Sequence, residues 1–458
     1  MPSEQNNFLT WRSRWTFILA ATGSAVGLGN IWKFPYIAGE NGGGAFVVVY
    51  LFCIALVGVP VMVAEVMLGR RGRKSPISSM RRLTTEAGLH GFWNSIGWLG
   101  AIIGLLILSF YSVIAGWSLA YIPEMATGAF QGANAQTTKT IFETMLADPD
   151  RLVFWHSVFV AMTIFVVAFG VTRGLGVAAR VLMPSLFVLL IVLLLFAYRY
   201  GDFSAGFSFL FSFDYERLTL RGVLEALGHA FFTLSLGVGA IMAYGAYMPA
   251  EASIGKTVAI IALFDTLVAL IAGMAIFPIV FAHGALDAAA GPSLLFISLP
   301  VAFGGMQAGV LFGSLFFILV TVAAWSSAIS LIEPAVAWMA EHKGVNRFTA
   351  TLFLGFLVWL LGLATVFSFN DWAEHKVLGM TFFDGLDFLT SRVLLPLTGL
   401  FIAIFVGWYF AAEHARAELN GEQSVIWSIW FYLLRYLCPP AIATVMIVGL
   451  YDSLVAGG

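Results

Sequence analysis

The first apolar segment of the chain contains more helix-weakening residues than an unbroken membrane helix would carry. Residues Gly23–Pro35 include three glycines and a proline: Gly23, Gly27, Gly29 and Pro35. Lipid cannot hydrogen-bond the backbone groups that a broken helix releases, so such breaks persist only around a buried site. Released carbonyls can hold a cation, and exposed amides can hold an anion. The segment therefore predicts a site for a cation together with a carboxylate.

The composition places most of the chain in a membrane. Of 458 residues, 60% are hydrophobic and 10% are charged, whereas a soluble domain carries about 25% charged residues. The net charge of -2 gives no reason to expect nucleic-acid binding. Cys53 and Cys438 fall in apolar segments and are expected to be small core residues. The N-terminus is polar and the first apolar stretch lacks a cleavage site, which predicts no signal peptide.

Apolar runs of about 20 residues predict membrane-spanning helices. Eleven candidates lie near residues 14–37, 42–68, 92–123, 152–171, 176–198, 222–248, 256–284, 307–340, 348–368, 376–411 and 424–450. The connecting segments are too short for a separate domain. We therefore expect one all-α membrane domain over residues 1–458.

The distribution of lysine and arginine predicts the orientation of these spans. Six basic residues follow the second span, namely Arg70, Arg71, Arg73, Lys74, Arg81 and Arg82. This connection is expected in the cytoplasm, together with the N-terminus. An odd number of spans then places the C-terminus outside.

A second interrupted helix is expected in the sixth span. Gly237 and Gly239 lie near its middle, beside Thr233 and Ser235. A glycine pair in a membrane helix is more often a close-packing device, but two breaks five spans apart favour two five-helix halves. Because each half has an odd number of spans, the halves form an inverted repeat. The repeats are expected over about 14–198 and 222–411, with an accessory helix over about 424–450.

Three segments resemble the neurotransmitter:sodium symporter family, which includes bacterial leucine, tryptophan and tyrosine transporters. They are residues 23–46, residues 231–247 and residues 323–334, and the resemblance extends from Trp11 to Tyr451. It implies a 5+5 inverted-repeat fold of the leucine-transporter type, here with eleven transmembrane helices. Helices 1 and 6 are expected to be unwound at mid-membrane.

The resemblance implies a first sodium site at Ala25, Asn30, Thr233 and Asp265. Many members have Asn at the last position. Animal members bind chloride near this site, and chloride-independent members carry an acid one helical turn further on, where this chain has Ala269. We therefore expect Asp265 to supply the negative charge and transport to be chloride-independent. The alternative is that Asp265 is only a structural polar residue whose needs are met by its packing partners. The depth of Asp265 in the membrane disfavours this alternative.

A second sodium site is implied at Gly23, Val26, Ala323, Ser326 and Ser327. Adjacent serines in a membrane helix more often bond back to the preceding turn. Their place in a matched segment favours the ligand interpretation.

The substrate site is implied between the two breaks. Amides near Leu28 and Gly29, with the Tyr111 phenol, are expected to bind a carboxylate. Carbonyls around Ala25, Phe232 and Ser235 would accept from an ammonium group, and Thr233 is also expected to contact the substrate. The side-chain pocket would be lined by Ser24, Ile107, Phe232, Val238, Ser327 and Leu331. Monoamine members place an Asp at Gly27, so its absence favours an amino acid.

The gates depart from the family pattern. The external pair is expected at Lys33 and Asp387, with Phe232 and Tyr111 closing the site, and His229 stands where a Gln is usual. A pH-sensitive gate and a simple repacking of the vestibule both remain open. On the cytoplasmic side Glu341 is the expected acid, but Phe8 occupies the place of its arginine partner.

The preferred function is a sodium-coupled symporter that imports a neutral, hydrophobic or aromatic L-amino acid by alternating access. The alternatives are a transport-inactive amino-acid sensor on the same fold and a symporter of another small zwitterion. An enzyme is not expected, because no nucleophile–base set or metal cluster is apparent. We also expect two bound Na⁺, no organic cofactor and no nucleic-acid partner. The protein is expected to be a monomer or weak homo-oligomer in a bacterial inner membrane.

Overall fold

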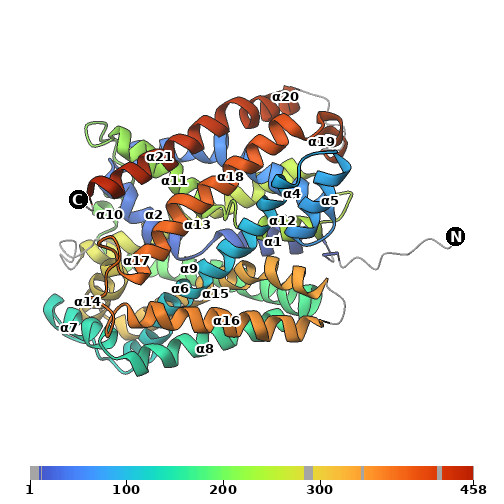
Figure 1. Ribbon diagram of the computed structural model, residues 1–458. Helices are drawn as coiled ribbons and strands as arrows, with labels where there is room; N and C mark the ends of the chain where they lie inside the picture. Colours follow the sequence, from blue (N-terminus) through green and yellow to red (C-terminus); the bar gives the residue numbers. More distant parts are fainter. Residues whose placement is uncertain (1–9, 12, 283–291, 342–344, 420–424, 457–458) are drawn as a thin grey trace.

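The computed structural model describes residues 10–11, 13–282, 292–341, 345–419 and 425–456 as a bundle of helices (Figure 1). Among these residues, nine helical segments are long and apolar enough to cross a membrane. They comprise α3–η2–α4 (Gly44–Gly72), η3–α6 (Gly91–Ala126), α8 (Pro149–Ala168), η4–α9 (Val171–Tyr200), α13 (Ile254–Phe281), α15 (Gly309–Ala340), α16 (Arg347–Phe367), α17–η7–α18–η8 (Phe382–Tyr409) and the Val425–Tyr451 part of α20 (Val425–Tyr432), η9 (Leu433–Leu437) and α21 (Cys438–Ala456).

The first and sixth expected spans are present as pairs of shorter helices. The first consists of α1 (Arg14–Ala25), the π-turn η1 (Gly29–Lys33) and α2 (Phe34–Glu40). The sixth consists of α11 (Leu220–Thr233) and α12 (Ala240–Ala246). Short helices connect the spans: α5 (Pro76–Glu86), α7 (Ala135–Leu146), α10 (Phe203–Phe211), α14 (Leu299–Gly305) and α19 (Ala412–Glu418).

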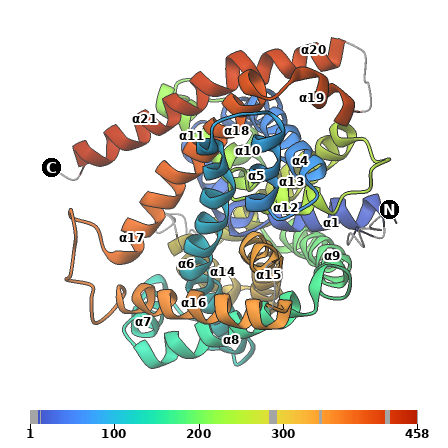
Figure 2. The same cartoon turned by 45° about the vertical axis from the view of Figure 1, so that its right-hand side comes forward.

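The interrupted helices lie inside the bundle. Figures 1 and 2 show α8 and α16 side by side along one face, and α20 with α21 along the opposite face. Between them, α6 and α15 pack on each other, and α15 also packs on α1 and α12. The long continuous helices therefore form a frame around both breaks. The beginning of α1 and the end of α21 lie at opposite ends of the bundle, as an odd number of spans requires.

The first break is shorter than the sequence predicts. Gly23 is helical in α1 and Pro35 lies in the first turn of α2, so regular structure is lost only at Val26 and Gly27. Val26 is the first residue to leave the helix, with ψ 111°. A Cβ on Gly23 would lie 3.0 Å from Met183 Sδ and 3.3 Å from Ser326 Cβ. Gly23 thus permits close packing of α9 and α15 against α1 and does not itself end the helix.

The second break is a tight turn held by a buried acid. Ser235, Gly237 and Gly239 have φ values of 52°, 79° and 76°, in the left-handed region that favours glycine. A Cβ on Gly237 would also lie 2.8 Å from the Leu395 carbonyl oxygen. The Gly237 amide donates to the fully buried carboxylate of Glu65 on α4, at 3.2 Å. Glu65 therefore caps an amide that the break releases.

Candidate functional site

A buried carboxylate without a cation partner lies beside both breaks. Asp265 on α13 has no exposed surface. Its Oδ1 accepts from Asn30 Nδ2 at 2.8 Å, and the Thr233 hydroxyl lies 3.0–3.1 Å from both carboxylate oxygens. Within the described ranges, no lysine, arginine or histidine nitrogen comes within 4.0 Å of it. Because an unpaired buried charge is costly in a membrane, this arrangement fits a site that receives a mobile cation.

Three of the four residues predicted to form the first sodium site come from separate elements and meet at one point. Asn30 lies in η1, Thr233 ends α11 and Asp265 lies in α13. The Asn30 amide oxygen accepts from the Gly27 amide at 3.1 Å, and its nitrogen faces Thr233 and Asp265. Rotation of this amide by half a turn would present its oxygen to an ion at the same place. Ala25, the fourth member, is the last residue of α1 and is buried.

The predicted sodium-two residues also converge. Ser327 Oγ lies 3.0 Å from the Val26 carbonyl oxygen and 3.3 Å from that of Gly23. The Ser326 hydroxyl donates to the Ala323 carbonyl at 2.9 Å, one turn away on α15. The end of α1 and the serines of α15 therefore bring carbonyl and hydroxyl oxygens together, which is the kind of donor set that suits a hard cation.

The carboxylate end of the predicted substrate site lies between these two cages. The Leu28 amide points at the Tyr111 hydroxyl, 3.4 Å away. A Cβ on Gly27 would lie 2.8 Å from Ser327 Oγ and 3.0 Å from Tyr111 Oη. Glycine at this position lets the backbone of the first break approach the hydroxyls of Ser327 and Tyr111 closely, beside an amide that could donate to an anion.

The remaining substrate residues line the same region with apolar groups and serines. Ile107, Val238 and Leu331 are all less than a tenth exposed. Sequence analysis missed Ser330, whose hydroxyl lies 2.7 Å from that of Ser24. The Ser235 hydroxyl donates to the Ser24 carbonyl at 2.8 Å and ties the two breaks together. A serine followed by an apolar residue on α15 gives no distinctive sequence signal, which explains the omission.

The external gate residues do not form the expected ion pair in this structure. The Lys33 ammonium lies over the Phe232 ring, 5.0 Å from its centroid. The Asp387 carboxylate instead accepts from the Ser391 hydroxyl at 3.0 Å. A Cβ on Gly29 would touch the Phe232 ring at 3.2 Å, so this ring covers the break. Lys33 therefore makes a cation–π contact with Phe232 in place of the expected ion pair with Asp387.

His229 lies directly behind this cover. It is 3% exposed, and neither ring nitrogen has a hydrogen-bond partner among the described residues. Its ring packs on Phe34 and Tyr50, each with centroids 5.7 Å away. These packing contacts are those of an aromatic side chain.

Glu341, the acid expected at the cytoplasmic gate, bonds to the N-cap residue of α5. Its carboxylate accepts from the Ser75 amide at 2.5 Å and from the Ser75 hydroxyl at 2.7 Å. Arg14, which follows Phe8 in the chain, donates to the Thr257 hydroxyl at 2.9 Å. Phe8 lies outside the described residues. Glu341 therefore ties α15 to α5 through Ser75.

A buried ion pair that the sequence did not predict joins α15 and α16. The Arg347 guanidinium on α16 binds both carboxylate oxygens of the fully buried Glu333 on α15. Its Nε donates to the Val167 carbonyl near the end of α8 at 3.0 Å, and the Tyr247 hydroxyl donates to Glu333 at 3.0 Å. Trp11 packs edge-on against Tyr247 and its amide donates to the Tyr247 carbonyl at 2.9 Å. The cluster thus joins the end of α12 to the frame helices.

Two interrupted helices whose released groups form oxygen cages inside a frame of continuous helices define an ion-coupled membrane carrier. Residues 9–145 and 151–454 match the model of the sodium:neurotransmitter symporter family, and the chain therefore belongs to that family. Its members are transporters and not enzymes. The chain is accordingly a sodium-dependent transporter, and the resemblance inferred from the sequence is confirmed.

Relatives and a solved structure agree with this assignment. The uncharacterized sodium-dependent transporter YhdH of Bacillus subtilis is 37% identical over 440 residues, 95% of this chain and 96% of that protein. A sodium-dependent transporter of Haemophilus influenzae is 31% identical over 451 residues, 96% and 98% of the two chains. The crystal structure of MhsT in complex with L-phenylalanine matches with a TM-score of 0.88 and 42% identity, covering 96% and 99%.

The predicted fold class is confirmed by this likeness. The chain has the leucine-transporter-type fold, with a 5+5 inverted repeat followed by one further helix; within the described residues, nine long apolar segments and two interrupted spans make eleven. Its first and sixth helices are unwound at mid-membrane.

Proposed function

We propose that this transporter couples sodium to the import of a neutral, hydrophobic or aromatic L-amino acid by alternating access. The observation that carries the proposal is the buried Asp265, which lacks a cation partner among the described residues and lies beside the amides of the first break. A sodium ion at Asp265 and a substrate carboxylate at Leu28 and Gly29 would be close neighbours. Each would then stabilise the other, which is a reciprocal coupling free energy.

Two sodium sites are part of the proposal. The first uses Ala25, Asn30, Thr233 and Asp265. The second uses Gly23, Val26, Ala323, Ser326 and Ser327. Their support is the convergence of hydroxyl and carbonyl oxygens described above. No organic cofactor is part of the proposed cycle.

Chloride independence follows from the charge of Asp265. A carboxylate at the first site supplies a negative charge. If a neutral residue stood there, a bound anion such as chloride would have to supply that charge. We expect Asp265→Asn to require chloride for amino-acid binding, while the wild type binds equally in chloride and gluconate. Loss of wild-type uptake on replacing chloride with gluconate would contradict this part of the proposal.

The substrate class rests on the pocket. Glycine at position 27 leaves no acid to pair with a decarboxylated amine, and Ile107, Val238 and Leu331 present apolar surface. The solved structure of MhsT contains L-phenylalanine. These observations together favour an amino acid with a bulky apolar side chain over another small zwitterion.

We further propose one membrane domain over residues 1–458 in a bacterial inner membrane, as a monomer or weak homo-oligomer. The repeats would cover about 14–198 and 222–411, and the accessory helix about 424–450. The N-terminus would be cytoplasmic and the C-terminus outside, because Arg70, Arg71 and the other basic residues of α4 and α5 gather at one end of the bundle.

Thermal stabilisation by each of the twenty amino acids, in sodium and then in potassium, tests the proposal. A ligand that binds only the folded state raises the midpoint temperature by mass action. We expect stabilisation by aromatic or large aliphatic L-amino acids in sodium and none in potassium. Equal stabilisation in both salts, or none by any amino acid, would contradict the proposal.

A further inference from the structure

The last membrane span contains a single charge. Between Val425 and Tyr451, Arg435 is the only Asp, Glu, Lys or Arg residue. Only 17% of the apolar window of this span is buried, so most of the helix faces the bilayer. A cation at such a place is costly unless an anion or water reaches it. The surroundings of Arg435 therefore indicate what neutralises it.

Among the described residues, Arg435 contacts aromatic rings and no acid. Its guanidinium carbon lies 4.3 Å from the Trp408 ring centroid, 5.5 Å from that of Tyr436 and 5.8 Å from that of Phe431. Its Nε is buried without an acceptor, and no carboxylate within the described ranges forms an ion pair with it. Aromatic faces attract the charge, but they do not satisfy the in-plane N–H groups. An acceptor is missing from the guanidinium edge.

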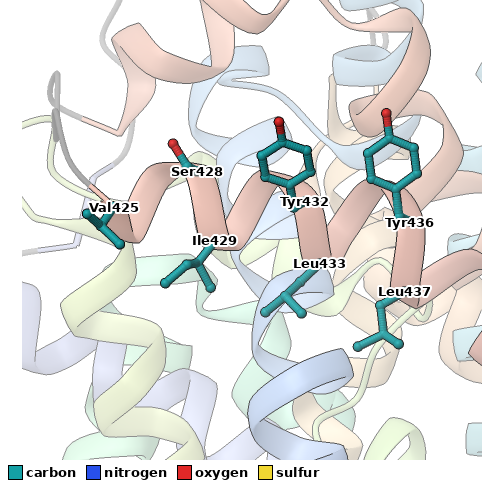
Figure 3. Close-up of a pocket in the computed structure, with 7 residues that line it drawn as sticks. All are labelled: Val425, Ser428, Ile429, Tyr432, Leu433, Tyr436 and Leu437. Carbon is teal, nitrogen blue, oxygen red and sulfur yellow. The ribbon is translucent and has the colours of Figure 1, made fainter.

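A shallow, open groove runs along the surface of the same helix, and Arg435 lies beside its lining residues. Its volume is about 690 Å³, and it is lined by Val425, Ser428, Ile429, Tyr432, Leu433, Tyr436 and Leu437. Figure 3 shows the hydroxyls of Ser428, Tyr432 and Tyr436 pointing to one side and the aliphatic side chains to the other. Tyr436 belongs both to the groove and to the rings around Arg435. The groove thus combines hydroxyl groups, an alkyl wall and a nearby cation.

We propose that this groove binds an anionic phospholipid, with its phosphate on the edge of the Arg435 guanidinium. A guanidinium fork matches phosphate oxygens in pairs. Tyrosine and tryptophan mark the headgroup level of a membrane, and here Trp408, Tyr432 and Tyr436 are each at least half exposed. An acyl chain would lie along the aliphatic row, which a free phosphate ion could not use.

An anionic headgroup fits better than a zwitterionic one. Arg416, exposed on α19, stacks on Trp427 of α20 at 5.5 Å without an ion pair in the described part of the chain. A second cation at this end of the helix raises the local positive potential. A choline or ethanolamine group brings a positive charge of its own, whereas phosphatidylglycerol does not. The site is independent of the proposed sodium and amino-acid sites.

Native mass spectrometry of the purified transporter titrated with dioleoyl-phosphatidylglycerol or dioleoyl-phosphatidylcholine tests the proposal. We expect the wild type to retain the anionic lipid at least fivefold more tightly. Arg435→Gln should reduce this to the phosphatidylcholine level, and Arg435→Lys should give an intermediate value because the fork is lost. Arg81→Gln is the matched control, since it removes one exposed charge from α5 and should leave lipid retention unchanged.

Three results for lipid retention would overturn the proposal. They are equal retention of both lipids by the wild type, equal loss in Arg435→Gln and Arg81→Gln, and displacement of the lipid by millimolar inorganic phosphate alone. The last would indicate an anion site without a role for the acyl chain. A dimer that forms on Arg435→Gln or disappears with it, without any change in lipid retention, would assign the face to a second copy of the chain instead. A midpoint temperature for each variant identifies any that fails to fold.

Discussion

The ion pair between Arg347 and Glu333 allows a prediction with a definite order of effects. Glu333 has no exposed surface, whereas 19% of the Arg347 side chain is exposed. After Arg347→Gln, the buried carboxylate keeps only the Tyr247 hydroxyl as a partner. Breaking a buried pair in this way costs about 3–5 kcal/mol, because the remaining charge is uncompensated.

The reverse change should be milder. In Glu333→Gln, the amide oxygen can still accept from Tyr247, and Arg347 keeps its bond to the Val167 carbonyl and its access to solvent. We expect a loss of about 1.5–3 kcal/mol, the range for hydrogen bonds to charged groups. The double variant removes both charges and should be more stable than Arg347→Gln alone, because the two effects are coupled.

Midpoint temperatures of the purified variants, measured in one detergent with sodium present, give the order directly. The prediction is that Arg347→Gln is least stable and that adding Glu333→Gln to it raises the midpoint. Tyr244→Phe is a matched control, since Tyr244 also packs on Trp11 but its hydroxyl forms no hydrogen bond within the described part of the chain. If Arg347→Gln were as stable as Glu333→Gln, or if the double variant were the least stable, the charge argument would be wrong.

Three further variants test the proposed sites. Gly27→Ala places a methyl group 2.8 Å from Ser327 Oγ, so it should abolish thermal stabilisation by the amino acid; retained stabilisation would place the carboxylate elsewhere. Tyr111→Phe removes the hydroxyl beside the Leu28 amide and should weaken equilibrium binding of radiolabelled amino acid about tenfold, whereas an unchanged Kd would exclude this contact. Ser326→Ala should raise the sodium concentration for half-maximal binding severalfold with the same maximum, while Ser314→Ala, which loses only a bond to its own helix, should not; identical sodium curves would remove Ser326 from the site.

The sequence was sufficient to predict the spans and the two breaks because both signals are local. Lipid requires long apolar runs, and glycine or polar residues within them stand out. The limits of the first break were less predictable. Gly23 is a glycine because α9 and α15 approach it closely, which a single sequence does not show, and Val26 leaves the helix although nothing in its type favours that.

Contacts between distant helices explain the remaining differences. Glu333 and Arg347 lie on consecutive helices, but their pairing depends on the angle at which α15 and α16 meet. Lys33 has two possible partners, an acid and a ring, and only the packing of η1 against α11 decides between them. Glu341 likewise bonds to Ser75 because α5 lies against the end of α15. Charge and residue type identified Lys33 and Glu341 as gate candidates without indicating their partners, and they did not indicate the Glu333–Arg347 pair at all.

The most direct test of the proposed function is uptake of a radiolabelled L-amino acid, chosen by thermal stabilisation, into proteoliposomes. The assay compares an inward sodium gradient with equal sodium on both sides, in gluconate throughout. We predict accumulation above the external concentration only with the gradient, and none for Asp265→Asn in gluconate. Binding without accumulation would instead identify a sensor, and accumulation without a sodium gradient would contradict coupling at the site around Asp265.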